Sequence, residues 1–135
     1  MKYREYTLPE SLLYNKDSSW IKIENDVATI GLIEPICKVL KEFLFVKLPD
    51  LTEIKKGDVY ASLETLKWSG HFTSPLNGEI IEVNDSLYDN PEKINKDPYS
   101  SWIIKIKINN KKEINDLFKP KDIVSWLDSV IKKGD

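Results

Sequence analysis

The sequence predicts a mainly β fold with short helices, arranged as a flattened barrel or sandwich. Short runs rich in β-branched and aromatic residues alternate with polar turns along most of the chain, as in VATIGLI at 27–33 and WIIKIKI at 102–108. In two segments a glycine is followed by an acidic residue and a run with β-branched residues: KKGDVYASLE at 55–64 and LNGEIIEVN at 76–84. This repetition favours a barrel or sandwich built from two similar halves. Helical spacing is confined to short segments, the longest at 34–42 and 122–133.

The strands follow from apolar runs that are bounded by turn residues. We expect them at 12–14, in a hairpin over 20–33, and at 43–48, 58–64, 71–74, 79–83 and 102–108. In the last of these, Trp102, Ile104, Ile106 and Ile108 share one face. Segment 49–57 and the dipeptide Ser69-Gly70 are expected to be loop and turn.

The helices are predicted from the spacing of apolar residues and from end signals. Pro35 suits the first turn of the helix at 34–42. The helix at 122–133 has an apolar stripe, which we expect to pack on the core, and its end is indicated by Lys132-Lys133-Gly134. The stripe comprises Ile123, Trp126, Leu127, Val130 and Ile131. The polar segment 84–100 and the region after 108 each hold one helical turn, at 91–95 and 113–118.

Length and composition limit the classes of protein that the chain can belong to. Its 135 residues suit one domain, 1–135, and a net charge of −2 argues against general nucleic-acid binding. The sequence lacks both an apolar run long enough to span a bilayer and an apolar signal core at its start. We therefore expect a soluble, cytoplasmic protein with no membrane partner. Cys37 is the single cysteine, so an internal disulfide is excluded. Its side chain is either a small buried hydrophobe or a reactive thiol.

An acidic stretch runs from Glu79 to Pro98, where six carboxylates stand against Lys93 and Lys96. It is either a docking face for basic partners near the tip of the predicted hairpin at 58–74 or a solvated loop.

The residues needed for catalysis are missing, but one lysine is prominently placed. His71 is the single histidine, and it is accompanied by no nucleophile motif, metal-ligand cluster or glycine-rich phosphate loop. Lys67 lies between two strand-like runs, three residues after Glu64, where a hairpin tip would present its amine to solvent and to other proteins. The sequence therefore favours a binding or carrier module over an enzyme.

Three long segments resemble the glycine cleavage system H protein family: DVATIGL at 26–32, FVKLPDLTEIKKGDVYASLETLK at 45–67, and SPLNGEIIEVNDSLYDNPEKINKDPYSSWIIKIK at 74–107. The resemblance covers about residues 11–131. It implies a lipoyl-domain-like barrel-sandwich hybrid with an N-terminal hairpin, a short helix and a C-terminal helix.

The resemblance also implies a cofactor and its attachment site. Glu64-Thr65-Leu66-Lys67 is similar to the family's E-S-V-K, so Lys67 is the implied attachment point of lipoic acid. Glu64, Trp68, His71 and Ser19 are then expected near the arm. The chain would be a non-catalytic carrier that is loaded by a lipoate ligase or lipoyl transferase, with dihydrolipoamide dehydrogenase as a further partner.

Two departures from the family bear on the cargo. Ser19 stands at the acid of the family's His-Glu-Trp triplet, and His71 stands at the acid four residues after the modified lysine. Those acids shelter a cationic aminomethyl group, so their loss favours sulfur as cargo. This predicts the lipoate-binding protein of a sulfur-oxidising heterodisulfide-reductase-like system, with that complex as partner. Trp68 and Phe72 would then form an apolar wall, although Trp68 equally suits simple packing on the hairpin.

Two alternatives remain open. In the first alternative, the chain is a glycine cleavage H protein that carries the aminomethyl group between glycine decarboxylase and aminomethyltransferase, and Glu34 or Glu64 replaces the missing acids. In the other alternative it is an unmodified interaction module.

Overall fold

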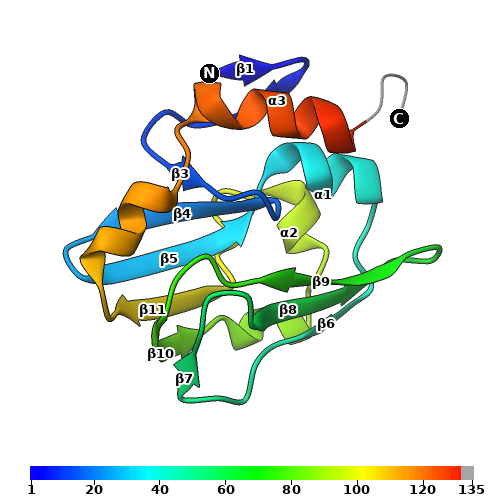
Figure 1. The fold of residues 1–135 in the computed structure, drawn as a ribbon. Coiled ribbons are helices and arrows are strands. Elements are labelled where there is room, and N and C mark those ends of the chain that lie inside the picture. The colour runs from blue at the N-terminus through cyan, green and yellow to red at the C-terminus, as the bar shows by residue number, and fades with distance from the viewer. Residues whose placement is uncertain (132–135) are drawn as a thin grey trace.

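The computed structural model describes residues 1–131, whose strands form two main antiparallel sheets and one small one (Figure 1). The larger sheet has the order β3-β4-β5-β11-β10-β7. Its strands are β3 (Leu13–Tyr14), β4 (Ser19–Glu24), β5 (Val27–Leu32), β7 (Glu53–Ile54), β10 (Gly78–Val83) and β11 (Ile104–Ile108). The three-stranded sheet is β6 (Phe45–Lys47), β8 (Val59–Glu64) and β9 (Ser69–Thr73), and the small sheet pairs β1 (Lys2–Tyr3) with β2 (Tyr6–Thr7).

The mainly β fold with short helices is confirmed, but the sheets do not close into a barrel. The main core gathers side chains from both larger sheets, including Ile30 and Ile106 from one and Tyr60, Leu63 and Phe72 from the other. The two segments with similar sequences form β8 and β10, which belong to different sheets.

The predicted hairpin at 20–33 is β4 and β5, which pair from Ser19↔Leu32 to Glu24↔Val27. Asn25 follows β4 with φ 57°, a conformation that asparagine tolerates in tight hairpin turns. The strand then leads directly into α1 (Glu34–Leu40), with Pro35 in its first turn as expected.

Strand β11 confirms the alternation predicted at 104–108, because Ile104, Ile106 and Ile108 are buried and Lys107 is exposed. The inclusion of Trp102 on that face is wrong. Trp102 precedes the strand and is half-buried, and the Lys105 ammonium lies 4.6 Å from its ring centroid.

Helix α3 (Pro120–Val130) packs on a second core beside the small sheet, as its apolar stripe predicts. Ile123, Leu127 and Ile131 are buried there, whereas Val130 is 46% exposed and does not belong to the stripe. The predicted range 122–133 is corrected, because the helix begins at Pro120 and ends at Val130, and Ile131 is already extended with φ −107° and ψ 100°. The expected end signal Lys132-Lys133-Gly134 lies outside the described residues.

Several predicted boundaries are corrected by the structure. The strand expected at 43–48 is shorter in the structure, where the edge strand β6 spans Phe45–Lys47 and Phe45 is 66% exposed. The expected loop at 49–57 contains β7, which is held by pairing with β10. Segment 84–100 contains the 3-10 helix η1 (Asp85–Tyr88) as well as α2 (Lys93–Lys96), and a second 3-10 helix, η2, spans Lys111–Asp116. Within residues 1–131 no helix is long and apolar enough to cross a membrane.

Candidate functional site

The β8–β9 hairpin projects away from the rest of the fold, at the right of Figure 1. The strands pair as far as Glu64↔Ser69, and residues 65–68 form the tip. The Thr65 N–H donates to the Trp68 carbonyl at 2.8 Å and closes the turn. The turn predicted at Ser69-Gly70 is therefore wrong, since both residues belong to β9 and pair with residues of β8.

The Thr65 side chain holds the tip in shape. Its Oγ1 accepts hydrogen bonds from the backbone N–H groups of Lys67, at 3.3 Å, and Trp68, at 3.1 Å. Threonine hydroxyls commonly stabilise turns by bonding to the backbone two residues on, so Thr65 two residues before Lys67 is a sequence signal for this turn.

Lys67 is exposed at this tip, beside Leu66, which is 89% exposed. Among residues 1–131 no carboxylate lies within ion-pair distance of its ammonium. The amine is therefore free to reach a modifying enzyme.

Trp68 anchors the tip to the sheet. Its ring lies 5.9 Å from the Phe72 ring, and a Cβ built on Gly70 would lie 2.4 Å from Trp68 Cζ2. Glycine at position 70 is thus what lets the indole pack closely against β9. Phe72 is buried below Trp68, so the predicted apolar wall consists of Trp68 and not of both rings.

A groove of about 560 Å³ separates the hairpin tip from the connection between α1 and β6. Its lining residues are Val39, Leu40, Lys41, Glu42 and Leu44 on the connection side, and Thr65, Leu66, Lys67 and Trp68 on the tip side. Trp68 therefore packs on the hairpin and lines the groove at once. Glu42, which no sequence motif singles out, is the groove's single carboxylate among the described residues.

The other residues predicted near the arm lie elsewhere. Glu64 is exposed at the end of β8, outside the groove lining. His71 is exposed on the face of β9 opposite Phe72, and its Nδ1 lies 2.8 Å from Ser62 Oγ. Ser19 is fully buried, with Oγ 2.5 Å from the Tyr60 hydroxyl. Of the residues expected around the arm, the structure brings Lys67 and Trp68 together in the groove.

Asp17, another residue that no sequence motif singles out, fixes the base of the hairpin. Its Oδ2 accepts from the backbone N–H of Thr73 at 2.5 Å and from the Thr73 hydroxyl at 2.6 Å. The loop before β4 is therefore bound to β9.

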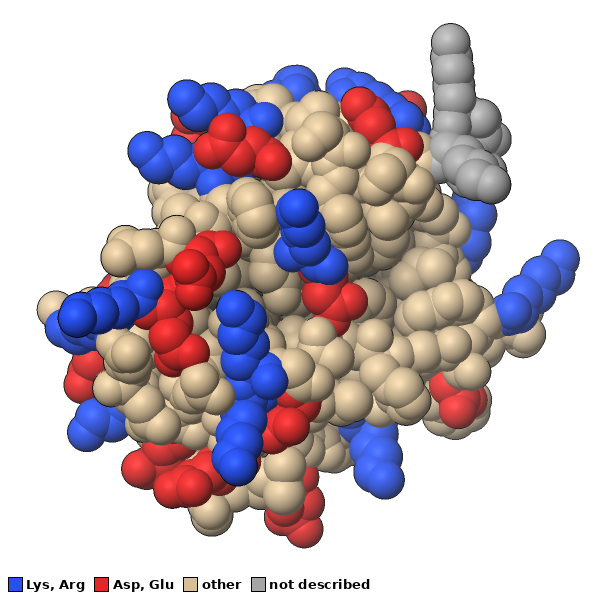
Figure 2. All heavy atoms as spheres, viewed as in Figure 1, with Lys and Arg blue, Asp and Glu red and all other residues tan. Residues whose placement is uncertain are grey.

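Two carboxylates of the acidic stretch lie away from the tip. Glu79 and Glu82 belong to β10, at the lower left of Figure 1, and Glu82 forms an ion pair of 3.5 Å with Lys105. Figure 2 shows both signs of charge interspersed over the face in view. The expectation of an acidic face near the tip is therefore wrong for the β10 carboxylates.

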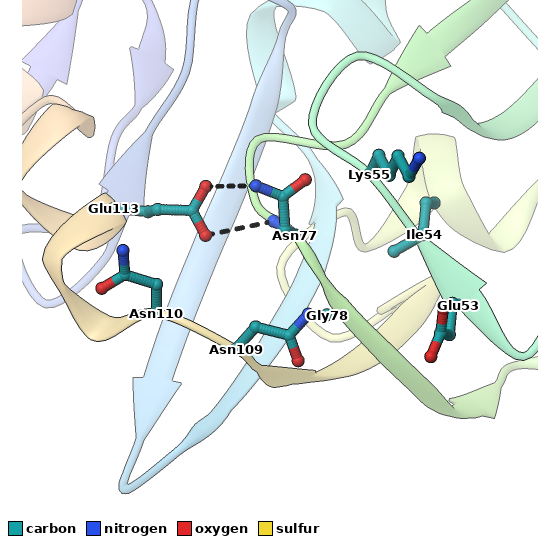
Figure 3. Close-up of a pocket in the computed structure, with 8 residues that line it drawn as sticks. All are labelled: Glu53, Ile54, Lys55, Asn77, Gly78, Asn109, Asn110 and Glu113. Atoms are coloured by element: carbon teal, nitrogen blue, oxygen red, sulfur yellow. Dashed lines mark hydrogen bonds between the residues drawn. The ribbon is translucent and has the colours of Figure 1, made fainter.

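A second depression lies between β7, β10 and η2 (Figure 3). Glu53 and Glu113 are its carboxylates among the described residues, and Glu113 accepts from Asn77 Nδ2 at 2.6 Å and from the Asn77 backbone N–H at 3.4 Å. Because these bonds tie the carboxylate to the turn before β10, we assign it a structural role. Among residues 1–131, no three His, Cys, Asp or Glu side chains are grouped as metal ligands.

Cys37 is buried against the core, and burial raises the pKa of its thiol. The buried-hydrophobe interpretation of this residue is therefore the one that its environment supports.

The fold and the hairpin define a class of carrier proteins that present one lysine on a rigid turn. A family model described as "Glycine cleavage H-protein" matches residues 12–130, so the chain belongs to the glycine cleavage H-protein family. Members of this family are non-catalytic carriers with lipoic acid attached covalently to a lysine. The exposed tip lysine of this chain fits that attachment.

Curated relatives agree with this assignment. The chain is 37% identical to the glycine cleavage system H protein of Halothermothrix orenii, over 91% of this chain and 98% of the relative. It is 40% identical to that of Clostridium botulinum (strain Loch Maree), over 82% and 85%. It is 38% identical to the probable glycine cleavage system H protein of Pyrococcus abyssi, over 93% and 96%.

A solved structure agrees on the fold. The crystal structure of a glycine cleavage system H protein from Mycobacterium marinum matches with a TM-score of 0.76 at 22% identity, covering 91% of this chain and 98% of that one.

Proposed function

We propose that the chain carries an aminomethyl group between glycine decarboxylase and aminomethyltransferase, on a lipoyl arm attached to Lys67. The observation that carries the proposal is Lys67 itself, exposed on a hairpin tip with no ion-pair partner among residues 1–131, in a chain 37–40% identical to glycine cleavage H proteins. This replaces the sulfur-oxidation hypothesis as the favoured function, because the relatives are named for glycine cleavage.

The residues around Lys67 supply a rigid base for the arm. The Thr65 hydrogen bonds and the packing of Trp68 fix the tip, so that motion is confined to the lysine side chain and what it bears. When bound, the lipoyl group supplies a dithiolane that is reduced, loaded and re-oxidised by thiol–disulfide exchange. Tethering raises the effective concentration of the cargo at each docked enzyme.

The proposal implies a set of partners. A lipoate ligase or lipoyl transferase forms the amide at Lys67, and dihydrolipoamide dehydrogenase re-oxidises the arm. We place the carrier in the cytoplasm together with these enzymes.

The test has two stages, and Lys67→Arg is the control because it keeps the charge but lacks the primary amine. Peptide mapping should find a lipoyl-sized mass on Lys67 and none in the control. The lipoylated chain should then support exchange of bicarbonate into glycine by glycine decarboxylase. An unmodified Lys67, in cells where other carriers are lipoylated, would instead support the interaction-module alternative.

A second candidate is the lipoate-binding protein of a heterodisulfide-reductase-like sulfur pathway. It is favoured by the absence of carboxylates at Ser19 and His71 and by the apolar residues Leu40, Leu44, Leu66 and Trp68 in the groove. Lipoylated chain that supports no exchange with glycine decarboxylase, but accepts sulfur from a heterodisulfide-reductase-like complex, would favour this candidate.

A further inference from the structure

Glu42 faces the hairpin tip across the groove. The residues at its two sides, Lys41 and Phe43, belong to the connection between α1 and β6, and Glu42 lines the groove together with Lys67 and Trp68. The Glu42 side chain is exposed, and no ion pair joins it to another described residue. Its carboxylate is therefore available to a group that enters the groove.

Asn95 of α2 fixes the backbone on both sides of Glu42. Its Nδ2 donates to the Lys41 carbonyl at 2.5 Å, and its Oδ1 accepts from the Phe43 N–H at 2.8 Å. The same Nδ2 donates to the carbonyl of Cys37 at 2.9 Å, and the Leu44 N–H donates to the Glu64 carbonyl at 2.8 Å. The Asn95 carboxamide thus holds the backbone around Glu42 against the end of α1, while the bond from Leu44 to Glu64 holds it against β8.

The connection is also strained, which indicates that its shape is held by these bonds. Lys41 has φ 70° and ψ −167°, a backbone region that favours glycine. Strain of this kind persists when surrounding contacts determine the conformation. Lys38 adds a further contact, because its ammonium donates to the backbone carbonyl of Asn95 at 2.6 Å.

Acylation of Lys67 changes the balance of charge in the groove. The amide is neutral, so Lys41 and Glu42 become the charged residues that line it. The adjoining depression adds Lys38, Glu92 and Lys96, and Lys38 is engaged with Asn95. Glu42 is therefore the carboxylate best placed to meet a cation on the arm, whereas Glu34 accepts from the Thr7 N–H at the other end of α1.

We infer that Glu42 pairs with the protonated amine of the aminomethyl cargo, and that Asn95 positions Glu42 for this contact. The inference rests on the proposed function, and it replaces Glu34 and Glu64 as candidates for the missing acids. An ion pair in the groove keeps the amine protonated, because a nearby opposite charge favours the charged form.

Protonation matters because loss of the cargo requires a neutral amine. The nitrogen lone pair expels the thiolate as the carbon–sulfur bond breaks, and water converts the resulting iminium ion to formaldehyde and ammonia. The cargo can be installed by the reverse reaction, in which a thiol of the phosphine-reduced arm condenses with formaldehyde and ammonia and releases water. Neither reaction needs a partner enzyme.

The experiment follows loss of the cargo from the chemically loaded, lipoylated chain by intact mass over a range of pH. Glu42→Gln should release it roughly two- to five-fold faster, as expected for an ion pair that is partly exposed to solvent. The pH at which loss accelerates should fall in this variant and return toward the original value in Glu42→Asp. Glu64→Gln is the matched control and should behave as the unchanged chain, because Glu64 does not line the groove.

The role of Asn95 is tested by non-additivity. Asn95→Ala should speed loss less than Glu42→Gln does, and the double variant should match Glu42→Gln alone, since Asn95 acts through Glu42. Additive effects would exclude positioning by Asn95. An unchanged rate in Glu42→Gln, or an equal effect of Glu64→Gln, would overturn the inference. The assay of cargo loss contains no glycine decarboxylase. Its outcome is therefore independent of whether the lipoylated chain supports exchange of bicarbonate into glycine.

Discussion

Removing the Ser19 hydroxyl should destabilise the protein more than removing its hydrogen-bond partner. Ser19 and Tyr60 are both fully buried, with their oxygens 2.5 Å apart. Ser19 Oγ also donates to the Asp17 carbonyl at 3.4 Å, so its single proton is used there and Tyr60 donates to Ser19. Burial raises the pKa of Tyr60, which keeps the phenol protonated as this arrangement requires.

The expected magnitudes follow from which group is left without a partner. Ser19→Ala leaves the Tyr60 hydroxyl buried and unpaired, at a cost of about 1–3 kcal/mol. Tyr60→Phe leaves Ser19 its bond to Asp17, so the loss is that of an ordinary hydrogen bond, about 1 kcal/mol. The double variant has no orphaned phenol and should be more stable than Ser19→Ala alone.

Urea unfolding followed by the fluorescence of the four tryptophans measures these differences, provided that the slope of unfolding free energy against urea is unchanged. A double variant whose loss equals the sum of the two single losses would refute the reasoning, because residues in direct contact must couple.

Three further outcomes are expected. In Gly70→Ala the new Cβ would meet the Trp68 ring. We expect this overpacking to lower the free energy of unfolding by about 1–3 kcal/mol and to shift the emission of Trp68 toward that of an exposed indole. Unchanged emission and stability would contradict the close contact. Cys37 should resist a thiol reagent in the native protein and take up a single label in denaturant, because it is buried and burial raises the pKa of its thiol; rapid native labelling would show the opposite. Burial and a hydrogen bond to Asp128 raise the pKa of Tyr3 from 10.0 to about 12, so the unfolded state loses this proton first and stability should fall as pH rises from 10 toward 12. Tyr3→Phe should flatten that fall, and an unchanged slope would exclude Tyr3 as its cause.

Periodic patterns predicted the elements that have one buried face. The alternation of Ile104, Lys105 and Ile106 predicted β11, and the spacing of Ile123 and Leu127 predicted α3. Such elements are determined by local sequence, because a shift of register would expose every buried side chain at once.

The remaining features depend on contacts distant in sequence. Strand β7 is two residues long and is defined by its pairing with β10. Glu42 belongs to the groove because Asn95, far along the chain, holds its backbone. The predicted hairpin tip and the family motif both indicated Lys67, but the groove beside it could not be predicted from spacing within either segment.

The tip composition also determines how the modified and unmodified forms can be told apart. Lys67 is the single charged residue in the turn 65–68, and its neighbour Leu66 is almost fully exposed. Lipoylation takes the formal net charge of the chain from −2 to −3 and leaves the tip of the β8–β9 hairpin uncharged and more apolar. The lipoylated form should therefore elute later from both an anion exchanger and a hydrophobic-interaction column, so the fraction modified in a preparation can be followed without proteolysis.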